Sequence, residues 1–133
     1  MKVIQTSGKR KCAIARATLR PGTGIVRVNH TPIDKIQPYL AKMKIQELMA
    51  IVDDEKLKTI NIDVIVEGGG TLGQIEAARI SISRAIVKFL AKKRILKEIR
   101  AYDRSMISGD SRTVEPKHWG GRKARRRFQK SYR

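Results

Sequence analysis

The chain of 133 residues has little of what several protein classes require. Cys12 is its only cysteine, which excludes an intramolecular disulfide and fits a reducing cytosol. One thiol and two distant histidines, His30 and His118, make a poor metal site, so we expect no metal. No apolar run reaches the length of a membrane span, and the N-terminus lacks the apolar segment of a signal peptide. These absences favour a cytoplasmic protein without membrane contact.

Acidic side chains are missing from both ends of the chain. The net charge is +18, from 30 Lys and Arg against 12 Asp and Glu. All the acidic residues lie within residues 31–116. In residues 1–30 and 117–133, every charged side chain is basic. A surface built for solubility alone would intersperse the two signs. The pattern predicts two basic contact regions on one folded body. It favours nucleic acid as the partner over an anionic membrane surface.

Apolar periodicity predicts an α+β body. Alternation predicts three strands, over residues 13–20, 25–29 and 59–67. The Pro and Gly of 21–24 predict a turn that joins the first two strands as a hairpin. Helical spacing predicts three helices, over 38–54, from Thr71 to at least Phe89, and over 92–101.

The apolar period stops after Asp103. We therefore expect a globular body over residues 1–103 and an extended basic tail over 104–133. The last 22 residues carry too few large apolar side chains to bury a core, so the tail should be disordered in isolation.

The stretch "VEGGGTLGQ", residues 66–74, has the G-x-G-x-x-G spacing of a dinucleotide-binding turn. That motif requires an acidic residue about 20 positions on, but the window 88–94 is basic. A phosphate-binding loop would need a lysine that is also missing. We therefore expect a structural turn, with or without an RNA phosphate at the helix start, and neither cofactor nor small-molecule substrate. Its glycines are Gly68, Gly69, Gly70 and Gly73.

Helical geometry places two small residues, Ala77 and Ser81, beside Arg84 and Lys88 on one side of the second predicted helix. This predicts an outward face that RNA backbone can approach closely; an ordinary solvated face is the alternative. Arg79 lies nearer the apolar stripe and is expected to snorkel rather than bind.

Aromatic residues are few, and three of them stand among the charges of the tail: Trp119, Phe128 and Tyr132. Rings interleaved with Lys and Arg are typical of single-stranded RNA binding, because each ring can stack on a base. A localisation signal or a solvated linker is the alternative for the tail. For the basic residues near the first strand, charge protection of an exposed strand edge is the alternative.

Three stretches together resemble the universal small-subunit ribosomal protein number nine family: residues 8–29, 68–86 and 109–133. The ending "FQKSYR" is similar to the archaeal and eukaryotic branch, and the short chain favours an archaeal source. The resemblance implies a compact two-layer body like the second domain of small-subunit ribosomal protein number five, with a left-handed β-α-β crossover. It also implies a non-catalytic structural role in the head of the small subunit. The implied partners are 16S-type rRNA, neighbouring ribosomal proteins and peptidyl-site tRNA.

The family's tail reaches the peptidyl site, where its terminal Arg touches the tRNA anticodon stem-loop. Carried over, the tRNA-contacting residues are Arg133 with Lys130 and Tyr132. The residues expected to bind rRNA are basic or aromatic: Lys9, Arg10, Lys11, Arg16, Arg84, Lys88, Arg112, Lys117, Trp119, Arg122, Lys123, Arg125, Arg126, Arg127 and Phe128. The alternatives are a general nucleic-acid chaperone or DNA-binding protein, and a nucleotide-dependent enzyme that uses the glycine turn.

Overall fold

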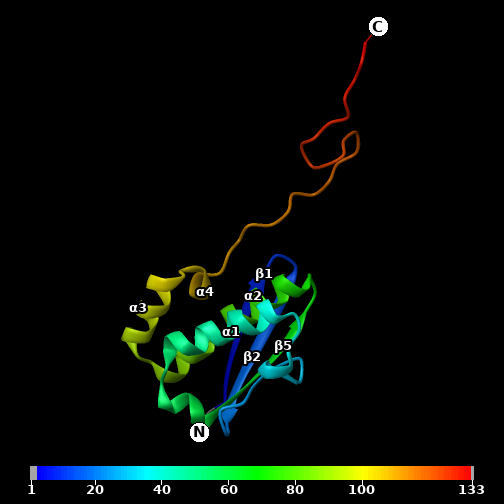
Figure 1. Cartoon of the computed structure of the whole chain (residues 1–133). Coiled ribbons are helices and arrows are strands. Elements are labelled where there is room, and N and C mark those ends of the chain that lie inside the picture. The colour runs from blue at the N-terminus through cyan, green and yellow to red at the C-terminus, as the bar shows by residue number, and fades with distance from the viewer. Residues whose placement is uncertain (1–2, 133) are drawn as a thin grey trace.

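The computed structural model describes residues 3–132 and contains one mixed sheet with helices, so the predicted α+β class is confirmed (Figure 1). The strands are β1 (Ile4–Arg10), β2 (Ala13–Pro21), β3 (Val26–Val28), β4 (Thr31–Pro32) and β5 (Ile60–Glu67). The helices are α1 (Tyr39–Val52), α2 (Thr71–Leu90), α3 (Lys93–Tyr102) and α4 (Ser105–Ser108), with 3₁₀ turns η1 (Ile33–Lys35) and η2 (Glu55–Thr59). The expected helices correspond to α1, α2 and α3.

The sheet has the strand order β1-β2-β5-β3-β4. The pairs β1–β2, β2–β5 and β3–β4 are antiparallel, whereas β3 runs parallel to β5. The connection from β3 to β5 passes through α1, which makes a β-α-β unit. The predicted hairpin of 13–20 with 25–29 is therefore wrong. The carboxamide oxygen of Asn61 accepts hydrogen bonds from the amides of Thr23 and Ile25, which carries the chain across β5 to its far side.

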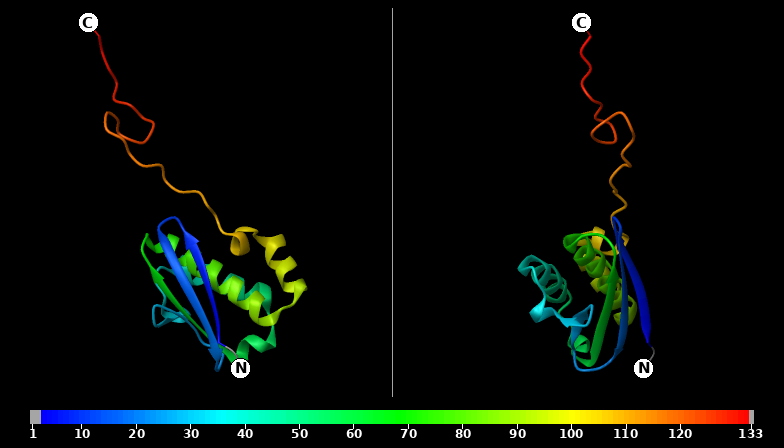
Figure 2. Two further views of the ribbon diagram at one scale, coloured as in Figure 1. Left: turned by 180° about the vertical axis from the view of Figure 1, so that it is seen from behind. Right: turned by 90° about the vertical axis from the view of Figure 1, so that its right-hand side faces the viewer.

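The helices cover one face of the sheet, as the edge-on view in Figure 2 shows. Strand β5 alternates as predicted, with Ile60, Ile62, Val64 and Val66 buried against the helices. On β2 the buried positions are mostly alanines, Ala13, Ala15 and Ala17. Small side chains there allow α2 to approach the sheet closely. No helix within residues 3–132 covers the opposite face of the sheet, which exposes side chains such as Arg16 and Ile65.

Strand β1 was not predicted, and it decides how α2 packs. A Cβ on Gly8 would lie 2.4 Å from the Ala77 carbonyl oxygen and 2.7 Å from the Ser81 amide nitrogen. Ala77 and Ser81 are fully buried, and the Thr6 hydroxyl donates a hydrogen bond to the Ser81 carbonyl at 2.8 Å. The predicted outward face of small residues is therefore wrong. Those residues face β1. The sequence of β1 is polar because the outer side of this strand is exposed, so no apolar alternation indicated a strand there.

The body remains packed beyond Asp103. The Asp103 carboxylate accepts a hydrogen bond from the Ser105 amide at 2.8 Å, which starts α4, and Met106 on α4 is buried in the core. Residues 111–132 form no helix and no strand apart from one isolated bridge, and their path leads away from the body (Figure 1). No helix within residues 3–132 is long and apolar enough to cross a membrane.

Candidate nucleic-acid interface

Arg10, at the end of β1, joins the body to the start of the C-terminal segment. Its Nε donates to Glu76 on α2 at 2.8 Å, and its Nη2 lies 3.3 Å from the Asp110 carboxylate. Its Nη1 donates to the carbonyl of Arg112 at 3.0 Å, and the backbones of Arg10 and Asp110 form a parallel bridge. We call residues 107–112 the tail root. One guanidinium therefore fastens the tail root to both β1 and α2.

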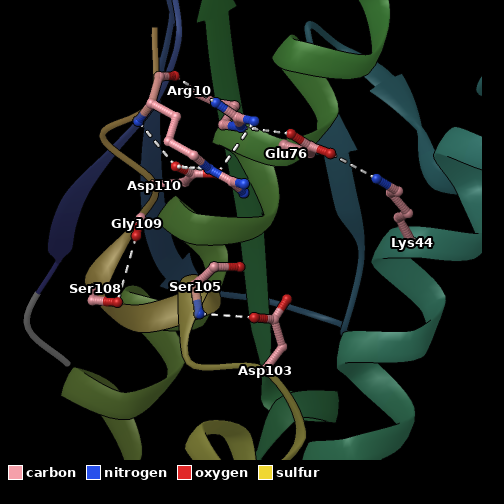
Figure 3. Close-up of polar contacts among 9 residues, drawn as sticks. Arg10, Lys44, Glu76, Asp103, Ser105, Ser108, Gly109 and Asp110 are labelled. Carbon is pink, nitrogen blue, oxygen red and sulfur yellow. Dashed lines mark hydrogen bonds and ion pairs between the residues drawn. The ribbon is translucent and has the colours of Figure 1, made fainter.

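Glu76 and Asp110, the two acids that contact Arg10, each interact with a second basic side chain as well (Figure 3). Lys44 on α1 donates to Glu76 at 2.8 Å, and this hydrogen bond, followed by that from Arg10, holds the pKa of Glu76 below its ordinary value. The Asp110 carboxylate accepts hydrogen bonds from Nε and Nη2 of Arg112, at 3.0 and 2.7 Å, and from the Arg112 amide at 3.0 Å, and these contacts hold its pKa well below the usual range. The network therefore neutralises charge internally and links β1, α1, α2 and the tail root.

Arg84 makes a second clamp on the same segment. Its Nε and Nη2 donate to the carbonyls of Ile107 and Ser108 at 2.8 and 3.1 Å. Its Nη1 donates to the carbonyl of Ser7 on β1 at 2.8 Å. Each guanidinium nitrogen thus contacts backbone, so the structure gives Arg84 and Arg10 internal roles that their charge alone did not predict.

The other basic residues predicted on the body are more accessible. Lys9, Lys11 and Lys88 are exposed and form no ion pair within residues 3–132. Arg16 lies on the open face of the sheet, 3.9 Å from Glu67, with both side chains mostly exposed. An ion pair of that kind contributes little energy and leaves Arg16 available to a partner.

The glycine stretch forms the turn between β5 and α2. Gly68 and Gly69 have φ of +74° and +68°, which glycine adopts without the strain of other residues. A Cβ on Gly68 would lie 2.7 Å from the carbonyl oxygen of Cys12, so the turn also packs tightly against the β1–β2 turn. Gly70 precedes the first residue of α2, and Gly73 lies in the first turn of that helix.

The segment beyond the tail root is exposed almost throughout. Trp119 is 93% exposed, Tyr132 is 86% exposed and Phe128 is 54% exposed. Arg125 makes a bidentate pair with Glu115, which raises the pKa of the guanidinium, and Arg127 donates to the carbonyl of Trp119. The remaining basic residues carry no ion pair within the described part of the chain: Lys117, Arg122, Lys123, Arg126 and Lys130. Arg133 lies outside the described residues.

No group of three or more His, Cys, Asp or Glu within residues 3–132 is placed to hold a metal ion. The residues that sequence reasoning missed are Gly8, Glu76 and Asp110. The only sequence feature that pointed to Asp110 was its position two residues before Arg112, at the edge of a basic segment. Nothing local indicated that its partner would come from the first strand.

By fold and charge, the molecule is one of the small, strongly basic α+β proteins that carry an exposed arginine-rich segment. Residues 8–133 match the family described as Ribosomal protein S9/S16. The small ribosomal subunit protein uS9 of Desulfurococcus amylolyticus is 49% identical over 133 residues, covering 100% of this chain and 94% of the relative. The uS9 protein of Methanothrix thermoacetophila is 41% identical over all of both chains. The chain belongs to the ribosomal protein S9/S16 family, which confirms the resemblance inferred from its motifs.

Proposed function

We propose that this protein is a structural constituent of the small ribosomal subunit and binds small-subunit rRNA. Family membership supports the assignment, and so does a net charge of +18 that the chain does not neutralise itself. It works without cofactor or small-molecule substrate and is not an enzyme. Its place is the cytoplasm, within the subunit, where neighbouring ribosomal proteins pack beside it.

The exposure of aromatic rings beyond the tail root carries the proposal. Trp119, Phe128 and Tyr132 contribute nothing to the core, yet each offers a ring beside uncompensated lysines and arginines. Stacking of a base on such a ring contributes about 1–3 kcal/mol, and each phosphate contact adds about 0.7–0.9 to the logarithmic salt slope. A solvated linker would gain nothing from these rings.

The finer parts of the proposal follow the family. The body takes the fold of the second domain of ribosomal protein number five, with the left-handed crossover at the β3–α1–β5 connection. It lies in the subunit head, and the segment beyond the tail root acts as an extended tail. Arg133, Lys130 and Tyr132 contact the anticodon stem-loop of peptidyl-site tRNA.

Deletion of residues 131–133 tests the tRNA contact. Subunits reconstituted with the shortened protein should incorporate it normally but bind peptidyl-site tRNA roughly tenfold more weakly. That factor corresponds to a charge-assisted hydrogen bond of about 1.5 kcal/mol. Unchanged tRNA affinity contradicts the contact.

Competition between small-subunit rRNA and duplex DNA for the full chain at matched salt tests the wider proposal. Preference for rRNA supports it, whereas equal affinity indicates a general nucleic-acid-binding protein.

A further inference from the structure

A basic cleft of about 410 Å³ lies where the chain leaves the body. Its walls include Lys9 and Lys11 from the β1–β2 end, Arg84 from α2, and the hydroxyl-bearing residues Ser108, Ser111 and Thr113. Cations and hydroxyl donors gathered around one opening are the chemistry that recognises a phosphate group.

The tail root also contributes to a second cleft, in which basic and acidic side chains are paired. The second cleft contains Arg10, Lys44, Glu76 and Asp110, whose charges are paired with each other. In the first cleft Lys9 and Lys11 have no acidic partner within the described residues. Among the described residues that line these two clefts, Lys9 and Lys11 of the first cleft are thus basic side chains without an acidic partner.

Asp110 is the one acid that lines the first cleft. Its carboxylate is already hydrogen-bonded to the Arg112 side chain and lies 3.3 Å from Arg10. The two arginines offset its negative charge, and Arg84 adds a further positive charge to the lining of the cleft. The electrostatic balance of the cleft thus favours an anion.

We propose that this cleft binds a backbone phosphodiester of RNA, with the ammonium groups of Lys9 and Lys11 as its principal ligands and the hydroxyls of Ser111 and Thr113 as donors. Arg84 shapes the wall through its three carbonyl contacts. In this arrangement the RNA backbone lies between the β1–β2 end of the body and the tail root. The inference rests on the proposed function, and it identifies a place on the body where the RNA binds.

The test compares two double variants of the full chain that each lose two positive charges at the same spacing. Lys9→Gln with Lys11→Gln removes the cleft lysines. Lys56→Gln with Lys58→Gln is the matched control, because η2 adjoins the start of β5 at the opposite end of the sheet. Binding to small-subunit rRNA is measured across a salt series, and circular dichroism checks that both variants stay folded.

The cleft variant should bind rRNA roughly tenfold more weakly than the control, and its logarithmic salt slope should be smaller by about 1.5, the loss of two phosphate contacts. Lys9→Arg with Lys11→Arg, which keeps both charges, should restore binding. If the wild-type chain binds no rRNA, the proposed function fails. If it binds and the cleft variant equals the control, only the cleft is overturned.

The single thiol at Cys12 offers an independent readout, because it is exposed beside Lys11. A radical-generating reagent attached there should cut rRNA at one confined region with the wild-type chain and lose that cut in the cleft variant. Scattered cuts that are the same in both proteins contradict the site. A titration with inorganic phosphate distinguishes free phosphate from RNA as the ligand, with the NMR signals of Lys9 and Lys11 as the readout. If free phosphate saturates these signals but does not change the affinity of the chain for rRNA, the RNA assignment is overturned.

Discussion

The guanidinium of Arg10 lies 3.3 Å from the carboxylate of Asp110, and the backbones of the two residues form a parallel bridge. The first residue belongs to the edge strand of the sheet and the second to the tail root. This contact fixes the place from which the chain leaves the body and holds the basic cleft on one side of it.

Replacing Asp110 with Asn should loosen the tail root without unfolding the body. The variant loses the ion pair with Arg10 and weakens the bidentate contact with Arg112. Amide hydrogen exchange over residues 107–112 should become faster, because local openings depend on such contacts. The midpoint of thermal unfolding should change little. Arg94→Gln, which breaks an exposed pair within α3, is the control and should leave exchange at the tail root unchanged. Unaltered exchange in Asp110→Asn would contradict the anchoring role.

Gly8→Ala should destabilise the whole body by about 1–3 kcal/mol, the range for overpacking a tight interior. The added Cβ would meet backbone atoms of Ala77 and Ser81, which cannot rotate away as a side chain can. Ser7→Ala is the matched control, because the Ser7 side chain is exposed and its carbonyl still accepts from Arg84. Urea unfolding measures both, and equal stability of the two variants would refute close packing of β1 on α2.

Gly68→Ala and Gly70→Ala should behave differently despite lying two residues apart. Gly68 combines a positive φ with a Cβ position 2.7 Å from the Cys12 carbonyl, so alanine there is expected to cost about 1–3 kcal/mol. A Cβ on Gly70 would meet nothing within 4 Å, and its φ of −101° suits alanine. Thermal unfolding should therefore show a loss for the first variant and little change for the second. A similar loss in both would mean that backbone flexibility alone matters in the turn.

Stability should fall at acid pH through Glu76. The hydrogen bond from Lys44, followed by that from Arg10, holds the pKa of this carboxylate below its ordinary value of 4.5. A group whose pKa is depressed by folding stabilises the folded state above its unfolded pKa, and that contribution disappears as the pH falls through the folded pKa. Thermal midpoints should thus be nearly constant from pH 7 to 5 and decline below about pH 4.5. The decline should be smaller in Glu76→Gln; an identical decline in both proteins contradicts the assignment to Glu76.

Much of the fold could be predicted from local pattern. Strand β5 alternates cleanly because one of its faces is buried, and α1, α2 and α3 follow helical spacing for the same reason. Strand β1 escaped because its outward side chains are polar and its inward position at Gly8 has no side chain to signal burial. The position of β5 between β2 and β3 was equally invisible, since Asn61 on β5 binds Thr23 and Ile25, which lie far from it in the sequence.

The sequence by itself determined the charge of this protein, the lack of acids at both ends, and the family motifs. These features are properties of composition and spacing, which do not depend on contacts between residues distant in the chain. Which cations remain available to RNA was decided only by the tertiary structure. Arg10 and Lys11 stand next to each other in the chain, yet one is paired with Glu76 and Asp110 and the other faces an open cleft. The physical reason is that an ion pair forms between groups brought together by packing, and those groups can lie at opposite ends of the chain.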